Sequence, residues 1–261
     1  MVLHDSGPRE IRVESQRFGD FTAEVSTAPR LAEPVDAVLV TVKATHLDDA
    51  LDRMPAAALG GALVIPFLNG IEHVEILRNV YPATSVVPAT IRIETTKVAP
   101  GVIRHTSPFA MVDIGPRGES IAVRLRATGI DVRIKDDEKA MLWDKMAVLA
   151  PMALLTTHER ASVGEVRARR RQDLVALVRE FASVAAAEGV PIDPDANLAF
   201  IDKAPKAMET SMQRDQAAGR PIEIDALGGA LLRRAAKAGV QVPVTRRLVQ
   251  ELLARPVSTF A

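Results

Sequence analysis

The chain has 261 residues, of which 48% are hydrophobic and 25% are charged, a composition typical of folded globular proteins. Basic and acidic residues number 33 each and aromatic residues make up 3%, so no nucleic-acid partner is expected. The absence of cysteine excludes disulfides, thiolate metal sites and cysteine nucleophiles. With no signal peptide and no apolar run of roughly 18 residues, we expect a cytoplasmic protein without membrane contact, and an enzyme is a reasonable expectation.

Short β-rich runs alternate with turns and helical stretches over the first half of the chain. Residues 35–42 form a nearly unbroken β-branched apolar run, which predicts a strand buried on both faces, as in a parallel sheet. Alternating strands and helices predict a right-handed α/β layer. Further strands are expected at residues 11–14, 21–25, 63–68, 86–87, 91–93, 95–98, 102–105, 111–114 and 131–134, and helices at 48–54, 72–79 and 120–128.

Beyond residue 135 the pattern is almost wholly helical. Pro151 is expected to kink the first helix and Pro205 to interrupt the third, while Gly189 and Gly239 are typical helix ends. The sequence thus predicts an α/β domain over residues 1–134 and a helical domain over residues 135–261. Helices are expected at residues 173–188, 224–238 and 243–254, one helix or a broken pair at residues 138–155, and one helix or a pair at residues 195–211.

Five short motifs follow one another in a fixed order. Two come directly after expected strands, and three lie in the helical half. Each is weak alone, but together they resemble the ketopantoate reductase family, and the resemblance runs from about Arg12 to Pro256. The motifs are VKAT at residues 42–45, LNG at 68–70, LWDKM at 142–146, TSMQRD at 210–215, and IEID at 222–225 followed by LLRRA at 231–235.

This resemblance implies a fold and a reaction. Members have an N-terminal Rossmann-like dinucleotide-binding domain and an all-α C-terminal domain of 6-phosphogluconate-dehydrogenase-like type. They reduce 2-dehydropantoate, a 2-oxo acid, with NADPH in pantothenate biosynthesis. We therefore expect a small-molecule 2-oxo acid substrate, the cofactor NADPH, and a homodimer formed through the helical domain.

The resemblance also implies roles in binding and reducing the substrate. Lys145 matches the catalytic lysine, whose ammonium contacts the substrate and can protonate a developing alkoxide; most lysines are simply solvated. Ser211 matches the serine that binds the substrate carboxylate. Asn69 matches an asparagine that contacts substrate and cofactor, although Asn-Gly is also a common turn signal.

The cofactor residues implied by the resemblance are Lys43, Asn69 and Glu223. Lys43 and Asn69 are expected near the nicotinamide and its ribose. Glu223 is expected at the ribose and beside Lys145, where a carboxylate would favour the charged lysine. It is also a favourable charge for a helix N-terminus, and both statements can hold. Asp215 is expected to be structural.

The sequence departs from the family at the phosphate-binding turn. No G-x-G-x-x-G motif occurs in the chain, although such glycines let the backbone approach the cofactor pyrophosphate. We expect the Rossmann-like domain to lack its first strand–helix–strand unit, about 30 residues. A fragment, an upstream start, or a decayed homologue without catalysis are the alternatives.

A second departure lies in the expected substrate pocket. Four and eight residues after the catalytic lysine the family usually has asparagines, where this chain has Leu149 and Ala153. Loss of hydrogen-bonding groups changes substrate discrimination, so a reductase for a bulkier or more apolar 2-oxo acid is a further alternative. No pair of histidines has metal-ligand spacing, so no metal site is expected. The basic run at residues 167–171 is expected to be a solvated face.

Overall fold

The computed structural model describes residues 2–3 and 9–255, which divide into two compact units. The α/β unit comprises residues 1–42, 46–68 and 73–138. The helical unit comprises residues 139–261 together with two short loops, Lys43–Thr45 and Asn69–Glu72. The loops thus belong by their contacts to the unit that lies later in the chain.

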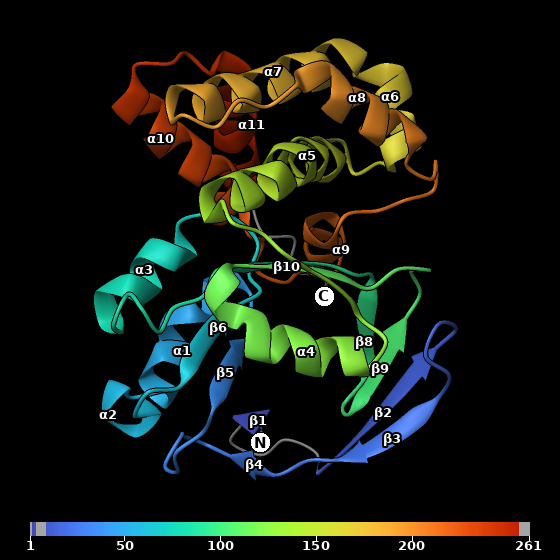
Figure 1. Ribbon diagram of the computed structural model, residues 1–261. Helices are drawn as coiled ribbons and strands as arrows, with labels where there is room; N and C mark the ends of the chain where they lie inside the picture. The colour runs from blue at the N-terminus through green and yellow to red at the C-terminus, as the bar shows by residue number, and fades with distance from the viewer. Residues whose placement is uncertain (1, 4–8, 256–261) are drawn as a thin grey trace. The chain divides into compact units, whose positions relative to one another are not determined.

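Figure 1 shows the elements in chain order. The strands are β1 Val2–Leu3, β2 Glu10–Ser15, β3 Phe21–Glu24, β4 Thr27–Ala28, β5 Ala37–Val40, β6 Leu63–Pro66, β7 Ala89–Arg92, β8 Thr95–Ala99, β9 Val102–His105, β10 Met111–Ile114 and β11 Asp131–Ile134. The helices are η1 Ala44–His46, α1 Leu47–Arg53, α2 Ala56–Leu59, α3 His73–Val80, η2 Pro116–Gly118, α4 Glu119–Ala127, α5 Glu138–Glu159, α6 Val163–Arg169, α7 Arg171–Ala187, α8 Pro194–Lys203, α9 Ser211–Ala217, η3 Asp225–Gly229, α10 Ala230–Ala238 and α11 Pro243–Leu253.

The α/β unit contains several small sheets. β5 and β6 run parallel, and β10 pairs with β11 in parallel and with β7 in antiparallel fashion. The other sheets have the orders β3-β2-β9-β8 and β1-β4. One face of the β7–β10–β11 sheet packs against α4, because alternate strand residues and one side of the helix are apolar. The buried cluster contains Ile65, Val87, Ala89, Val112, Ile114, Ile121, Ala122 and Val132.

The strand expected at residues 35–42 is shorter and less buried than predicted. β5 covers only Ala37–Val40. Its parallel pairing with β6 is confirmed, and Val40 is buried, but Leu39 on the opposite face is 43% exposed. The prediction of burial on both faces is wrong: β5 packs chiefly against β6, and Leu39 is left partly exposed.

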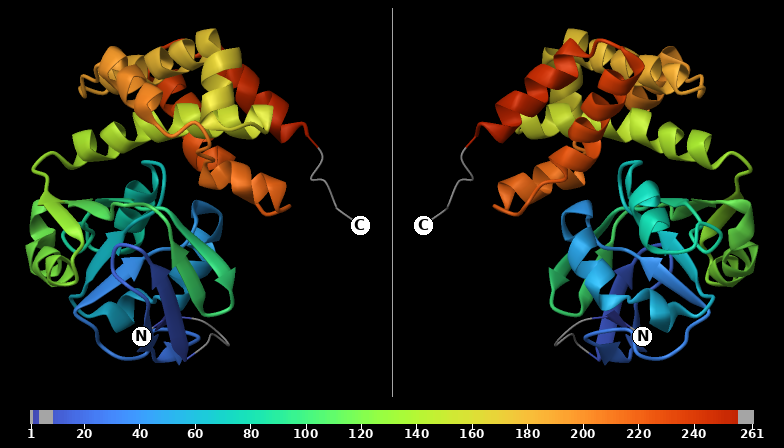
Figure 2. Two further views of the ribbon diagram at one scale, coloured as in Figure 1. Left: turned by 90° about the vertical axis from the view of Figure 1, so that its right-hand side faces the viewer. Right: turned by 90° about the vertical axis from the view of Figure 1, so that its left-hand side faces the viewer.

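In the helical unit, α7 is the central helix and contacts α6, α8, α10 and α11. Figure 2 shows these helices from two sides. The apolar positions of α7 recur every three or four residues, so they form one face that the neighbouring helices cover. The helix expected at residues 173–188 is confirmed, and its buried apolar face consists of Leu174, Leu177, Val178, Phe181, Val184 and Ala185.

Two parts of the helical unit differ from the sequence prediction. The helix or pair expected over residues 195–211, interrupted by Pro205, is observed as α8, which ends at Lys203, but Ser211, expected to end this stretch, begins a separate helix, α9. Thr210 caps α9 by accepting the Gln213 N–H, so the Thr-Ser pair starts a helix and does not end one. α6 was not expected; Ser162 and Glu165 form a capping box at its start. α5 is continuous, with Pro151 buried inside it.

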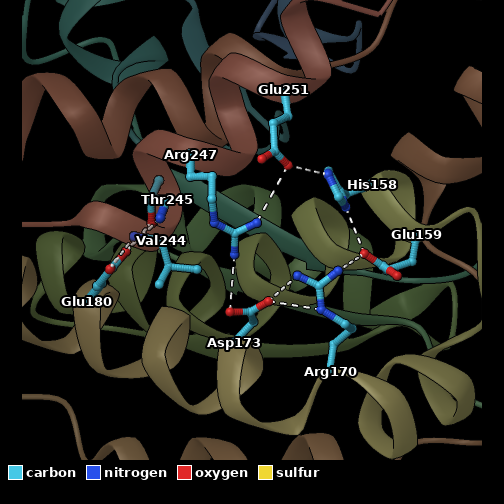
Figure 3. A network of polar contacts seen from close by, with 9 residues as sticks. All are labelled: His158, Glu159, Arg170, Asp173, Glu180, Val244, Thr245, Arg247 and Glu251. Atoms are coloured by element: carbon cyan, nitrogen blue, oxygen red, sulfur yellow. Dashed lines mark hydrogen bonds and ion pairs between the residues drawn. The ribbon is translucent and has the colours of Figure 1, made fainter.

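A closed ring of six side chains, alternately basic and acidic, joins three segments of the helical unit (Figure 3). His158 at the end of α5 contacts Glu159 and Glu251. Ion pairs continue around the ring in the order Glu159, Arg170, Asp173, Arg247 and Glu251. Each basic side chain therefore lies between two acidic ones, and the ring joins the end of α5 to the start of α7 and to α11.

Candidate active site

The two loops of the helical unit follow neighbouring parallel strands. Lys43–Thr45 comes shortly after β5 and Asn69–Glu72 after β6. Since parallel strands end at the same edge of a sheet, residues just beyond them come together, and such edges commonly bind ligands. Lys43 and Asn69, both expected in the site, lie on these loops.

Glu223 connects the two loops. The residue is 4% exposed. Oε1 accepts the backbone N–H of Ala44 at 3.0 Å, and Oε2 accepts the side-chain amide of Asn69 at 3.0 Å. A buried carboxylate needs such donors, and hydrogen bonds to a charged acceptor are stronger than neutral ones. Glu223 therefore orients the Asn69 side chain and holds the turn that follows Lys43.

Gly70 brings its loop into close contact with the helix that follows Glu223. Gly70 has φ +91°, and a Cβ there would lie 2.7 Å from the carbonyl oxygen of Ala226. Ala226 belongs to η3, a π-helical turn, a geometry often found at functional sites. Only glycine allows both this backbone conformation and this approach.

Arg233 joins Glu72, at the end of the Asn69–Glu72 loop, to Asp225 at the start of η3. Its guanidinium donates to Glu72 at 2.7 Å and to Asp225 at 2.7 Å. The hydrogen bonds that Arg233 donates to Glu72 and Asp225 raise its pKa above its already high ordinary value. The Asn69–Glu72 loop is thus attached at Asn69, Gly70 and Glu72.

Lys43 has an acidic partner on α9. Its ammonium lies 2.6 Å from Oδ2 of Asp215, whose side chain is 4% exposed. The other carboxylate oxygen of Asp215 accepts Nε of Arg220 at 3.0 Å. Lys43 itself remains 39% exposed, so its charge is both paired and accessible.

Lys145 and Ser211 lie on α5 and α9, where both are half-buried. With 3.6 residues per turn, Lys145, Leu149 and Thr156 fall on one face of α5, and Ala153 lies at its border. Thr156 hydrogen-bonds Thr210, the residue before Ser211, at 2.8 Å. The start of α9 is thus anchored to the α5 face that carries Lys145.

The structure brings Asn69 and Glu223 into direct contact and pairs Lys43 with Asp215 of α9. Sequence reasoning missed the contributions of Ala44, Gly70, Glu72 and Arg233. Glu72 and Arg233 are 161 positions apart, and no local pattern signals such a pair. The described residues contain no cluster of metal-ligating side chains, and no helix among them is long and apolar enough to cross a membrane.

Comparison with known proteins assigns both units to one family. Residues 8–119 match "Ketopantoate reductase PanE/ApbA", and residues 137–255 match "Ketopantoate reductase PanE/ApbA C terminal". The 2-dehydropantoate 2-reductase of Mycobacterium tuberculosis is 33% identical over 88% of this chain and 80% of its own length.

Solved structures agree with this assignment. A PanE/ApbA family ketopantoate reductase from Ralstonia eutropha has TM-score 0.85 and 28% identity, covering 93% of this chain and 83% of its own. D-mandelate dehydrogenase with NADH and anilino(oxo)acetate has TM-score 0.86 at 21% identity, covering 94% and 84%, and so shares the fold. The predicted fold class, a Rossmann-like α/β part followed by a helical part, is confirmed, and the chain belongs to the ketopantoate reductase family of oxidoreductases.

Proposed function

We propose that the protein reduces 2-dehydropantoate, or a related 2-oxo acid, to the 2-hydroxy acid with NADPH, as a step of pantothenate biosynthesis. The observation that supports this most is Glu223, a buried carboxylate that holds the loops carrying Lys43 and Asn69. The family assignment supplies the reaction type. A homodimer through the helical unit and a cytoplasmic location stay predictions.

The residues have separate roles in this proposal. The Lys145 ammonium stabilises the developing alkoxide and donates the proton to it, and Ser211 hydrogen-bonds the substrate carboxylate. Asn69, oriented by Glu223, contacts the substrate and the nicotinamide ribose. The contact between Glu223 and Lys145 expected from the resemblance stays a prediction.

The donor groups fit the nicotinamide end of a dinucleotide. Lys43 offers an accessible ammonium and Asn69 an oriented amide, and the bound cofactor would supply the hydride. The chain has no G-x-G-x-x-G turn for the pyrophosphate. We therefore propose that residues 1–134 form a dinucleotide-binding domain that lacks the strand–helix–strand unit with this turn.

A second candidate is a reductase for a different 2-oxo acid. Leu149 and Ala153 lie near Lys145 on α5, with Leu149 half-buried and Ala153 buried. Apolar groups at these positions favour an apolar side chain on the substrate, since a pocket discriminates through the groups it can pair. A panel of 2-oxo acids with polar and apolar side chains separates the two candidates through kcat/KM.

The first test is cofactor binding and turnover. We expect saturable NADPH binding in a nicotinamide-fluorescence titration, and NADPH consumption with a 2-oxo acid. Lys145→Ala is expected to lower kcat about 10²- to 10⁴-fold, the usual contribution of a general acid. Lys237→Ala, an exposed lysine of α10, is the matched control and should leave kcat unchanged.

Two results would contradict the proposal. If neither NADPH nor NADH binds, the decayed homologue without catalysis becomes the better explanation. If turnover survives Lys145→Ala, the protein is a reductase, but the proton comes from another group.

A further inference from the structure

Asp215 is a buried carboxylate with a cation on each oxygen. Oδ2 lies 2.6 Å from the Lys43 ammonium, and Oδ1 accepts Nε of Arg220 at 3.0 Å. The Asp215 side chain is 4% exposed, whereas those of Lys43 and Arg220 are 39% and 55% exposed. A carboxylate so buried is costly unless it is paired, and here both of its oxygens have a cationic partner.

The chain reversal after α9 explains how Arg220 reaches Asp215. Gly219 has φ +64°, its N–H donates to the Gln216 carbonyl, and the Arg220 N–H donates to the Asp215 carbonyl at 2.8 Å. This pair of bonds is the Schellman ending of a helix, with glycine in the left-handed position. It places Arg220 beside the Asp215 side chain through backbone geometry, independently of Lys43.

The charges of this cluster do not balance. One carboxylate faces two cations, so the cluster keeps one positive charge. Arg220 pairs with one oxygen and holds the carboxylate in a fixed orientation, which leaves the other oxygen for Lys43. The Lys43 ammonium is thereby held at one point while its side chain remains accessible to an anionic or hydroxyl-bearing ligand.

We infer that Asp215 is a positioning residue, which holds Lys43 in place for the cofactor; this inference rests on the proposed function. Asp215 acts through Lys43 and need not touch the cofactor itself. Asp215 can act on cofactor binding in two ways, through its negative charge or through the position in which it holds Lys43. Removing the negative charge while keeping the shape, as in Asp215→Asn, should tighten the binding of an anionic cofactor if only charge matters, and should weaken it if the position of Lys43 matters.

A double-mutant cycle on cofactor affinity tests the inference. The NADPH dissociation constant is measured at physiological salt for wild type, Asp215→Asn, Lys43→Met and the double variant. We expect Asp215→Asn to weaken binding on the order of tenfold when Lys43 is present, the value of one charge-assisted hydrogen bond. In the Lys43→Met background the same change should cost less than about twofold.

Two controls show that folding is not responsible. Thermal midpoints are recorded for all four proteins, and Asp215→Glu is expected to restore part of the affinity because it returns a carboxylate. Asp202→Asn removes a carboxylate that pairs with Arg171 elsewhere in the helical unit, where both side chains are more than 40% exposed. It should leave the dissociation constant unchanged.

The outcomes are distinguishable. Equal weakening by Asp215→Asn in both backgrounds, together with a lowered thermal midpoint, would show a purely structural role and overturn the inference. Tighter binding by Asp215→Asn would also overturn it, in favour of a charge effect. If the wild type binds neither NADPH nor NADH, the proposed function fails as well, whereas the first two outcomes leave it intact.

Discussion

At the scale of single residues, the candidate site depends on buried polar groups whose hydrogen bonds come from distant parts of the chain. Glu223 accepts from Ala44 and Asn69, and Asp215 accepts from Lys43 and Arg220. The motifs that resemble the family pointed to Lys43, Asn69 and Glu223, because each stands in a recognisable local pattern. The catalytic and binding roles of these residues, like those of Lys145 and Ser211, stay predictions.

Gly70 gives a test at this scale. Gly70→Ala should lower the free energy of unfolding by about 1–3 kcal/mol, because alanine is strained at this φ and its Cβ meets the Ala226 carbonyl. Gly239→Ala is the matched control: Gly239 has φ +68° but no atom within 4 Å of an added Cβ, so only the backbone strain of about 1 kcal/mol applies. Urea unfolding of both variants gives the comparison, and equal losses would argue against the close contact.

At the scale of elements, a helix of the helical unit can be capped by a side chain of another helix as well as by a residue of its own first turn. α11 begins at Pro243 without a side-chain cap of its own. Glu180 of α7 supplies the acceptor: its carboxylate, 8% exposed, accepts the N–H groups of Val244 and Thr245 at 2.8 Å each. It also accepts the Thr245 hydroxyl at 2.6 Å (Figure 3). A negative charge at a helix N-terminus is also favourable electrostatically.

Glu180→Ala is therefore expected to destabilise the protein by about 1–3 kcal/mol, because it leaves buried donors without an acceptor. Glu180→Gln, which keeps one acceptor oxygen but loses the charge, should fall between Glu180→Ala and wild type. Chemical denaturation followed by circular dichroism measures both. A Gln variant as unstable as the Ala variant would show that the charge matters more than the hydrogen bonds.

At the scale of the whole molecule, ion pairs that cross between elements give the folded state a dependence on pH. Asp113 of β10 is paired with Arg92 of β7 and Arg133 of β11, and its side chain is 3% exposed. Burial raises the pKa of Asp113, but the hydrogen bonds and charges of Arg133 and Arg92 outweigh it and hold the pKa below the ordinary value. Asp173 and Glu188 in the helical unit also have a lowered pKa, for the same combination of causes.

A lowered pKa in the folded state means that the unfolded chain binds these protons first as the pH falls. The stabilisation is complete above the ordinary Asp value, 3.8, and is lost as the pH drops through the lower folded value. We expect Asp113→Asn to lower the thermal midpoint at pH 7 and to flatten its decline in acid. Asp36, which pairs with Arg124 on the surface, is the control: Asp36→Asn should change neither the thermal midpoint nor its decline in acid. If the midpoints of wild type and Asp113→Asn decline in parallel as the pH falls, Asp113 does not cause the loss of stability in acid.

The chain order of strands and helices could largely be predicted from local sequence. Short β-rich runs between turns marked β2, β3, β9, β10 and β11, and apolar residues at helical spacing marked α7. Prediction failed where the outcome depends on distant contacts. Leu39 is 43% exposed although it stands in an apolar run, and Thr210, which caps α9 at Ser211, also hydrogen-bonds Thr156, 54 positions away.

The sequence by itself determined the two-part architecture and the family, because periodicity and short motifs are local properties of the chain. Tertiary structure alone decided which groups meet. Glu223 hydrogen-bonds the loops after β5 and β6, and Gly70 lies against the π-helical turn. Lys43 pairs with Asp215, 172 positions away. The physical reason is that hydrogen bonds and ion pairs act over a few ångströms in space, and separation along the chain does not reveal which residues come that close.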